Sequence, residues 1–440
     1  DLVRSRGLGD VYKRQVQQLC NAVGGTLLQE SGAVVTEVST DSRSIPAGAL
    51  FVPLVAERFD GHDYLDAALA GGAAGCLTAK KPISLLDGKF YIQVPDTLKA
   101  LKALAAWYRD KFTIPMVQVT GSAGKTTTKE MIAAVLSQRF STLKTQANFN
   151  NAIGTPLTLL NLAPEHQAAV IETGMNHFGE IRYLGEMVRP TVAVITNVGD
   201  AHIENLGGTR QGILQAKCEI FENLQPGGLA VLNGDDELLS GLTLPFETVL
   251  CGQHKRCGVR VANVAEHGID GVTCTVTTVR DVYEVSIPSP GAYMIYPAAM
   301  AIAIGEHLGL TKAEMLAGIA AYRPVGSRMH LVRCSNDRII IDDCYNANPQ
   351  AMAEALRILA QTEHPRRMAV LGDMGELGDL TEQAHRDMGT LARTLGLNTV
   401  VAIGPKAKAI QEADPDALWF PTVTAVSYTH LRAHETVLDL

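Results

Sequence analysis

Short runs of apolar residues recur through the middle of the chain, with helical stretches between them. The runs are IPMVQVT, AAVIE, TVAVITN and LAVLN, all between residues 114 and 233. Apolar strands that alternate with helices are typical of a parallel sheet covered by helices on both faces. A later run rich in Val and Thr, GVTCTVTTVRDVYEVSI (271–287), predicts a small antiparallel addition to that sheet.

The regions on either side carry strand patterns of their own. Residues 16–110 combine short strands with a Gly- and Ala-rich stretch, YLDAALAGGAAGCLT, for which we expect helix. Residues 326–426 begin a second series of strands and helices, with RIIID, RRMAVLG and TVVAIG as the strands. The pattern therefore predicts an α/β protein with three domains, at residues 16–110, 111–325 and 326–426.

The two ends of the chain lack this periodicity. The segments DLVRSRGLGDVYKRQ (1–15) and SYTHLRAHETVLDL (427–440) resemble translated sequencing-adapter text, so we interpret both as non-native tails. Frayed native termini are the alternative interpretation. On either interpretation, we expect the native protein to extend further at each end.

Composition narrows the function classes. The formal net charge of −8 and the scattered Lys and Arg residues argue against a nucleic-acid partner or a membrane-surface protein. No apolar run is long enough to cross a bilayer, and no signal peptide is recognisable. The eight cysteines form no C-x-x-C pair, so we expect reduced thiols and no zinc site. These features favour a soluble cytoplasmic enzyme.

The segment VQVTGSAGKTTTKEM (117–131) combines a strand, a Gly-rich turn and the start of a helix. Small residues let backbone amides approach phosphate oxygens, and the helix N-terminus adds a favourable dipole. Lys125 can neutralise phosphate charge, and the Thr126 hydroxyl can bind Mg²⁺. The common P-loop pattern needs a Gly where this chain has Val119, so this loop is shorter. The residues expected to contact the nucleotide phosphates are Gly121, Ser122, Ala123, Gly124, Lys125, Thr126 and Thr127.

Two further polar residues follow strands of the same predicted sheet. Glu172 ends the run AAVIE, and His202 follows TVAVITNVGDA. Ligands of open parallel sheets bind at the carboxyl ends of the strands, so we expect both side chains beside the phosphate loop. Taken singly, Glu172 is interpreted as a helix-capping acid and His202 as a packed loop histidine. Their joint placement favours a nucleotide site with a hard cation.

These segments resemble the Mur ligases, the cytoplasmic enzymes that build the peptide stem of bacterial peptidoglycan. The segment TGSAGKTTTKE (120–130) looks like the ATP loop of that family, which is shorter than the common P-loop. The resemblance covers nearly all of residues 16–426. Several segments look like the family branch that adds D-alanyl-D-alanine, namely NFNNAIGTPLTLL, ETGMNHFGEI, ITNVGDAHIENLG, IDDCYNANPQAM and LGDMGELG.

The resemblance implies an ATP-dependent amide ligase. The carboxylate of UDP-N-acetylmuramoyl-tripeptide would attack the γ-phosphate of ATP to give an acyl phosphate, and D-alanyl-D-alanine would then displace phosphate. ATP and two Mg²⁺ ions are the implied cofactors, and we expect a monomer. The N-terminal domain would bind the UDP-sugar, the central domain ATP, and the Rossmann-like C-terminal domain would close as a lid.

The resemblance also assigns roles to residues. Thr126 and Glu172 would serve one Mg²⁺, and His202 with a carbamylated Lys217 the other. The expected catalytic residues are Lys125, Glu172, His202 and Lys217. Taken alone, Lys217 is interpreted as a surface lysine on an amphipathic helix. The remaining expected contacts are Arg328, Asp343 and Asn346 to ATP, Asp41, Ser42 and Arg43 to the UDP-sugar, and Asn148 and Asn151 to the substrate region.

Some positions and functions leave alternatives open. Asn148 and Asn151 have a second interpretation as turn-capping residues. Tyr293 and Pro297 stand where the family has a His and an Asn near the adenine, and Ala56 replaces a usual Gly.

Two rival functions remain. One is another amide ligase of the Mur or folylpolyglutamate type, which the segments GMNHFGEI and DDCYNANP disfavour. The other is a non-catalytic nucleotide-binding module. The retained metal-binding residues disfavour that module.

Overall fold

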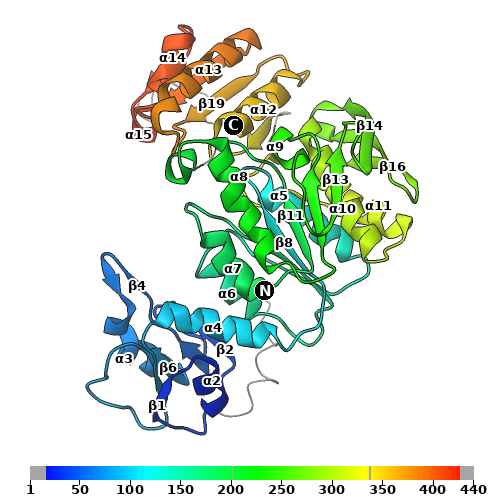
Figure 1. Cartoon of the computed structure of the whole chain (residues 1–440). Coiled ribbons are helices and arrows are strands. Elements are labelled where there is room, and N and C mark those ends of the chain that lie inside the picture. The colour runs from blue at the N-terminus through cyan, green and yellow to red at the C-terminus, as the bar shows by residue number, and fades with distance from the viewer. Residues whose placement is uncertain (1–15, 201, 336–337, 427–440) are drawn as a thin grey trace.

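The computed structural model describes residues 16–200, 202–335 and 338–426, which form an N-terminal, a central and a C-terminal part (Figure 1). The central part lies between the other two. The predicted non-native tails, 1–15 and 427–440, lie outside the described residues. Within the described residues, no helix is both long enough and apolar enough to span a bilayer.

The N-terminal part is built on a five-stranded sheet. The strand order is β1 (Thr26–Gln29), β7 (Phe90–Gln93), β6 (Gly75–Thr78), β3 (Ala49–Phe51) and β2 (Glu37–Ser39). Only β1 runs antiparallel to its neighbour. The other elements are α2 (Val16–Ala22), the hairpin β4 (Val55–Ala56) and β5 (Phe59–Asp60), η1 (Gly61–Tyr64), α3 (Leu65–Ala70) and α4 (Thr97–Arg109). The helix prediction for YLDAALAGGAAGCLT is wrong in its second half, because α3 ends at Ala70 and the last four residues form the buried strand β6.

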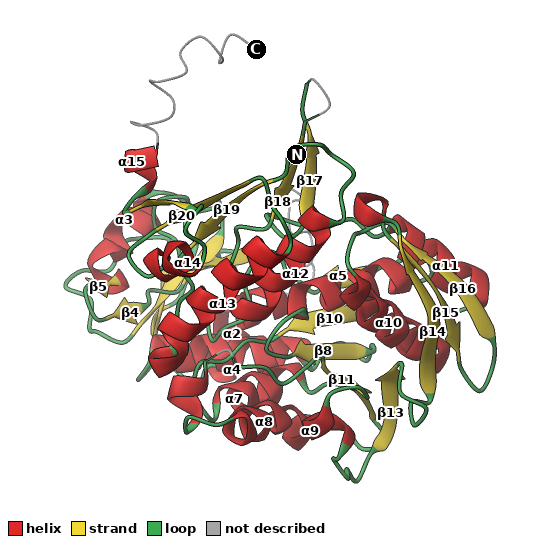
Figure 2. Ribbon diagram, turned by 90° about the horizontal axis from the view of Figure 1, so that it is seen from above, coloured by secondary structure: helices red, strands yellow, loops and turns green. Residues whose placement is uncertain are grey.

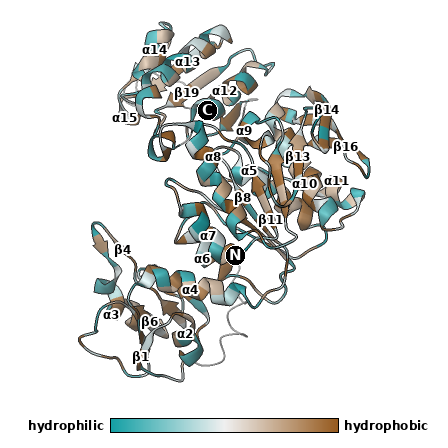
Figure 3. Ribbon diagram, in the orientation of Figure 1, coloured by the Kyte–Doolittle hydropathy of each residue, from teal (hydrophilic) through white to brown (hydrophobic). Residues whose placement is uncertain are grey.

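The central part contains a nine-stranded sheet, and all four predicted apolar runs are strands in it. They form β8 (Met116–Thr120), β10 (Ala168–Glu172), β11 (Val192–Ile195) and β12 (Leu229–Asn233), and every residue of these strands is buried. Figure 3 shows their hydrophobic colouring. The remaining strands are β9 (Thr142–Lys144), β13 (Glu247–Gly252), β14 (Val259–Glu266), β15 (Val272–Thr277) and β16 (Val282–Ile287). The predicted antiparallel addition is confirmed, because β14, β15 and β16 pair antiparallel.

Helices cover both faces of this sheet, as predicted (Figure 2). Val170 packs into the core beneath α5 (Lys125–Leu136) and α10 (Ile295–His307), while Ala169 and Ile171 pack into the core on the opposite face. Neighbouring strand residues point to opposite faces, so a strand covered on both sides must be apolar throughout. The other helices of this part are α6 (Gly154–Leu159), α7 (Glu180–Val188), η2 (Ile203–Leu206), α8 (Arg210–Cys218), η3 (Glu219–Asn223), α9 (Glu237–Ser240), η4 (Gly268–Asp270), η5 (Ala292–Met294) and α11 (Lys312–Ala321).

The N-terminal and central parts share one apolar core. Leu101, Leu104 and Tyr108 of α4 are fully buried in a cluster that includes Leu50 of the N-terminal sheet and Leu184 of α7. The Tyr108 hydroxyl also donates to the Leu162 carbonyl at 2.7 Å. Helix α4 therefore packs against both parts.

The C-terminal part combines an antiparallel hairpin with a three-stranded parallel sheet. The hairpin strands are β17 (His330–Arg333) and β18 (Ile339–Asp342), and the sheet order is β19 (Met368–Gly372), β20 (Thr399–Ile403) and β21 (Leu418–Phe420). The three predicted strands of this region are β18, β19 and β20. Its helices are α12 (Pro349–Ala360), η6 (Gly378–Leu380), α13 (Thr381–Thr394), α14 (Lys408–Ala413) and α15 (Val423–Val426).

Candidate active site

The phosphate loop, residues 121–124, connects β8 to α5 in a conformation that only small residues allow. Gly124 has φ +75°, in the left-handed region, and directly precedes the first turn of α5. A Cβ atom on Gly121 would lie 1.8 Å from Thr196 Oγ1, so no side chain fits there. The amides of the first turn of α5 have no partner within the helix, so they can bind an anion at the carboxyl end of β8.

The loop is held by residues that follow the neighbouring strand β11. Asn197 Oδ1 accepts hydrogen bonds from the amides of Ser122 at 3.1 Å and Ala123 at 2.8 Å. The Thr196 hydroxyl donates to the Ala123 carbonyl at 2.6 Å, and the Gly199 amide donates to Ser122 Oγ at 2.9 Å. The Ser122 and Ala123 amides therefore bond to Asn197 in this conformation.

Lys125 lies at the start of α5, and its side chain folds back over the loop. Its Nζ donates to the Gly121 carbonyl at 2.8 Å and lies 3.3 Å from the Ser122 carbonyl oxygen. Burial lowers the pKa of Lys125, while the negative charge of Glu172 opposes that shift and Arg328 adds to it. Charges from the central and C-terminal parts therefore act together on this ammonium.

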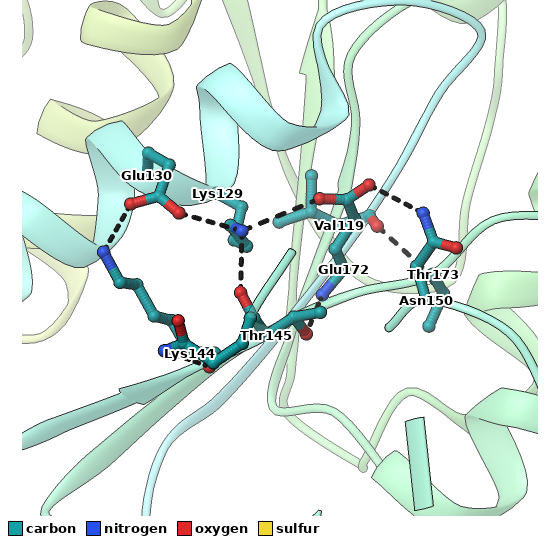
Figure 4. A network of polar contacts seen from close by, with 9 residues as sticks. Val119, Lys129, Glu130, Lys144, Thr145, Asn150, Glu172 and Thr173 are labelled. Carbon is teal, nitrogen blue, oxygen red and sulfur yellow. Dashed lines mark hydrogen bonds and ion pairs between the residues drawn. The ribbon is translucent and has the colours of Figure 1, made fainter. Parts of the chain in front are cut away.

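Thr126 and Glu172 are both buried at this edge of the sheet, at 4% and 1% exposure. Asn150 Nδ2 donates to Glu172 Oε1 at 2.8 Å (Figure 4). Glu172 Oε2 accepts no hydrogen bond from any residue that the structure describes. A buried carboxylate oxygen without a donor suits a hard cation such as Mg²⁺. Across the described ranges, no group of three or more His, Cys, Asp or Glu side chains forms a metal-binding cluster, so a cation here would also need other donors.

Lys217 lies in the last turn of α8 and is only 1% exposed. The alternative interpretation as a surface lysine is therefore wrong, because the polar-looking helix turns this residue inward. Burial lowers the pKa of Lys217 well below its usual range, and the nearby charge of Lys125 lowers it further. This environment favours the neutral amine.

His202 precedes η2 in a left-handed backbone conformation, with φ +64°. Its Nδ1 lies 2.7 Å from Oε2 of Glu376, a residue of the C-terminal part that also has positive φ. Burial lowers the pKa of His202, Glu376 opposes the shift, and Lys125 and Lys217 reinforce it. Lys125 therefore interacts electrostatically with Glu172, His202 and Lys217. Glu172 and His202 were expected here because they follow strands, whereas Lys217 was assigned only by the family resemblance.

The predicted C-terminal contacts flank the hairpin of β17 and β18, with Arg328 before it and Asp343 and Asn346 after it. The Arg328 guanidinium carbon stacks 4.0 Å above the centre of the Tyr345 ring, and the Met329 amide donates to Asp343 Oδ1 at 3.0 Å. Burial raises the pKa of Asp343 to about 6. Asn346 is exposed two residues before Asn348, whose side chain caps α12. The contacts of Arg328 and Asp343 described here are therefore with neighbouring residues of the C-terminal part.

The predicted substrate-binding residues lie further from the loop. Asn151 Oδ1 accepts from the amides of Ile153 at 3.0 Å and Gly154 at 2.9 Å, which is the turn-capping geometry of the alternative interpretation. Asn148 is exposed on the same loop. In the N-terminal part, Asp41 pairs with Arg43 at 2.8 Å, with Ser42 between them. The Arg43 guanidinium lowers the pKa of Asp41 to about 2.

The departures expected near the adenine lie around the start of α10. Pro297 occupies the first turn, where its missing amide would have no helical partner. Tyr293 packs near Ile358 of α12, and burial strongly raises its pKa. The Tyr296 hydroxyl donates to Asp235 Oδ2 at 3.1 Å. A cavity of about 550 Å³ opens beside it, lined by Asp235, Glu237, Gln253, His254, Arg256 and Tyr296.

The sequence did not identify four residues that shape this site. Asn197 holds the phosphate loop, Asn150 holds Glu172, Lys129 lies 3.9 Å from Glu172 Oε2, and Glu376 contacts His202. Asn150 and Asn197 stand within the quoted segments NFNNAIGTPLTLL and ITNVGDAHIENLG, so the signal was present. Lys129 and Glu376 also stand within quoted segments, TGSAGKTTTKE and LGDMGELG, but their contacts with Glu172 and His202 join residues that lie far apart in sequence.

Two family models match the chain. The Mur ligase middle domain matches residues 119–305, and the Mur ligase glutamate ligase domain matches residues 327–438. The chain is 36% identical over 422 residues to the UDP-N-acetylmuramoyl-tripeptide–D-alanyl-D-alanine ligase of Escherichia coli, covering 93% of this chain and 90% of that protein. It is 35% identical over 406 residues to the ligase of the same name from Bacillus subtilis, covering 91% and 88%.

Solved structures show the same similarity over the whole fold. A MurF structure from Acinetobacter baumannii superposes with a TM-score of 0.88 at 31% identity, covering 96% of this chain and 92% of that one. A MurF ligase from Thermotoga maritima, solved in complex with ADP, superposes with a TM-score of 0.77 at 28% identity and covers 87% of each chain.

Proposed function

The chain belongs to the Mur ligase family, and we propose that it joins D-alanyl-D-alanine to UDP-N-acetylmuramoyl-tripeptide in peptidoglycan precursor synthesis, with conversion of ATP to ADP and phosphate. The observation that carries the proposal is the meeting of Lys125, Glu172, His202 and Lys217 around one phosphate loop. These residues come from four separate segments of a chain that matches the ligases over nearly its whole length.

The reaction needs charge neutralisation more than covalent help from the protein. The tripeptide carboxylate attacks the γ-phosphorus of ATP, the bond to ADP breaks, and an acyl phosphate forms. The amine of D-alanyl-D-alanine then attacks the acyl carbon, phosphate leaves with the bridging oxygen, and the amine loses a proton as the amide forms. Two anions must meet in the first step, so cationic groups and backbone amides at the loop lower its barrier.

Lys125 and the first turn of α5 would serve that role. The Lys125 ammonium, which bonds to loop carbonyls of its own segment, would rotate away from them to bind a phosphate oxygen. The free amides of the helix N-terminus bind the same phosphate chain. Asn197 keeps the loop in the conformation that aims these groups outward.

The donor set fits Mg²⁺, which when bound would neutralise phosphate charge. Thr126 and the free Oε2 of Glu172 would hold one ion. His202 and Lys217 would hold a second, with Lys217 as an anionic carbamate, because its neutral amine can add CO₂. Glu376, whose Oε2 lies 2.7 Å from His202 Nδ1, would orient that ring when a metal binds, as carboxylates beside metal-binding histidines do.

The flanking parts would bind the ends of the substrates and exclude water. Asp41, Ser42 and Arg43 of the N-terminal domain (16–110) would contact the UDP-sugar, with Asn148 and Asn151 nearer the peptide. Arg328, Asp343 and Asn346 of the C-terminal domain (326–426) would contact ATP across the crevice from the central domain (111–325). Closure would protect the acyl phosphate from hydrolysis.

The proposal also covers the adenine-binding site, the oligomeric state and the location of the enzyme. The cavity beside Tyr296 would hold the base. An aromatic contact would replace the contact of the Asn side chain that the family has at the position of Pro297. We also propose that the enzyme acts as a monomer in the cytoplasm, where both of its small-molecule substrates and ATP are available.

The proposal is tested by phosphate release with ATP, UDP-N-acetylmuramoyl-tripeptide and D-alanyl-D-alanine, each omitted in turn. Full release should require all three and should match the amount of ligated product found by mass spectrometry. Release that proceeds with another amino acid or dipeptide, but not with D-alanyl-D-alanine, would indicate a different amide ligase. ATP binding without any release would indicate a non-catalytic module.

A further inference from the structure

A buried ionic network lies beside Glu172 (Figure 4). Its centre is Lys129, one turn further along α5 than Lys125 and only 1% exposed. Lys129 Nζ donates to the Thr145 carbonyl at 2.7 Å and lies 2.9 Å from Glu130 Oε1. The function proposed above gives this lysine no role.

The distance from Lys129 to Glu172 is informative. Lys129 Nζ lies 3.9 Å from Glu172 Oε2, close enough for strong attraction but too far for a hydrogen bond. The ammonium group donates a hydrogen bond to the Thr145 carbonyl and forms an ion pair with Glu130. Glu172 Oε2 therefore faces a cation that compensates its charge and yet does not occupy its lone pairs.

The neighbouring residues keep Lys129 at that distance. Glu130 is itself buried and its other oxygen pairs with Lys144, so two carboxylates and two ammonium groups balance within the network. Thr145 connects the two sides, because its carbonyl accepts from Lys129 while its hydroxyl accepts from the Glu172 amide at 3.0 Å. Asn150 holds the other carboxylate oxygen of Glu172 at 2.8 Å.

Packing alone does not explain a charged lysine at this buried position. Burying an ammonium group destabilises the folded protein unless partners compensate it, and an apolar side chain of similar length would fill the space at lower cost. The arrangement makes sense if the cation serves Glu172. Resting on the function proposed above, we propose that Lys129, held back by Glu130, is a positioning residue that keeps Glu172 oriented with Oε2 open for Mg²⁺.

Metal affinity tests this role separately from turnover. Mn²⁺ replaces Mg²⁺ as the probe, ADP is present throughout, and free Mn²⁺ is measured by electron paramagnetic resonance. Lys129→Met removes the cation, so Glu172 loses its orientation and Mn²⁺ affinity should fall by about 10–100-fold, the usual effect of losing a second-shell partner. Glu130→Gln frees Lys129 to close onto Glu172 Oε2 and compete with the metal, so it should also weaken Mn²⁺ binding.

Lys144→Met is the matched control. Lys144 pairs with Glu130 but not with Glu172, so its loss should leave the Mn²⁺ affinity at the parental value. A purely structural Lys129 predicts a lower melting temperature with unchanged or tighter Mn²⁺ binding, because a positive charge beside the metal has been removed. That result for a folded Lys129→Met variant would overturn the proposal.

The remaining outcomes are also decisive. If circular dichroism shows that Lys129→Met does not fold, the Mn²⁺ affinity of Glu130→Gln tests the proposal instead. That variant should fold, because Lys129 keeps Glu172 as an anionic partner. Parental Mn²⁺ affinity in Glu130→Gln would overturn the proposal. Failure of the proposed function looks different: the parent protein would bind Mn²⁺ with ADP and show these variant effects, yet form no ligated product.

Discussion

Asn197→Ala should weaken nucleotide binding although Asn197 has no expected contact with the nucleotide. Its side-chain oxygen accepts two hydrogen bonds, from the amides of Ser122 and Ala123, and it lies on the segment after β11 rather than on the loop itself. Removing the side-chain acceptor leaves the Ala123 amide without its partner, while the Ser122 amide keeps its hydrogen bond to the Asn197 backbone carbonyl at 3.1 Å. The Ala123 end of the loop must then be ordered when the nucleotide binds.

The size of the effect follows from those two bonds. The bond to Ala123 contributes about 1 kcal/mol net and the shared bond to Ser122 contributes less, so the loss is about 1–2 kcal/mol. If the whole loss appears on binding, ADP affinity falls roughly 5- to 30-fold, since about 1.4 kcal/mol corresponds to a factor of ten. Isothermal titration calorimetry with ADP measures this change directly.

The control is Asn161→Ala, which removes an exposed asparagine that donates to the Leu157 carbonyl outside the site. That variant should bind ADP as the parent does. Asn197→Ala protein that is folded and binds ADP with parental affinity would refute the reasoning, because the loop would then be ordered without its anchor.

Three further predictions concern charged residues of the site. Lys125→Ala should lower phosphate release by orders of magnitude without changing the circular dichroism spectrum, because the loss is local and electrostatic; near-normal release would remove Lys125 from the mechanism. Lys217→Ala should be inactive and recover part of its activity with added short-chain carboxylates, which supply the missing oxygen donors; an alanine variant that is fully active without additive would exclude a carbamate role. Burial raises the pKa of Asp343 from 3.8 to about 6, so the folded protein holds this proton more tightly than the unfolded chain and loses stability as pH rises between those values. Asp343→Asn keeps an acceptor for the Met329 amide and should raise Tm more above pH 6 than below pH 3.8, and equal Tm changes at both would contradict this.

The central fold was predictable because its strands are apolar throughout. The strands β8, β10, β11 and β12 are buried on both faces, so each leaves a continuous apolar run in the sequence. Strand β14 is half exposed and leaves a mixed pattern, so periodicity did not reveal it. Gly75–Thr78 forms a buried strand within a Gly- and Ala-rich stretch, where composition favoured a helix.

Some residues of the site were also predictable from the sequence, and others were not. Glu172 and His202 were found because they follow strands, and parallel topology places such residues at one edge. The choice between Asn150 and Asn151 depends on side-chain direction within one turn, and the structure directs Asn150 to Glu172 while Asn151 caps the turn. Contacts such as Glu376 with His202 depend on how the parts pack together, which no local pattern encodes.

Isotope transfer tests the central claim most directly. The carboxylate of UDP-N-acetylmuramoyl-tripeptide is labelled with heavy oxygen, and the phosphate released on ligation of D-alanyl-D-alanine is examined by mass spectrometry. An acyl phosphate leaves its bridging oxygen on phosphate, so the account predicts one labelled oxygen in each phosphate released. Unlabelled phosphate formed together with ligated product would contradict the acyl-phosphate mechanism.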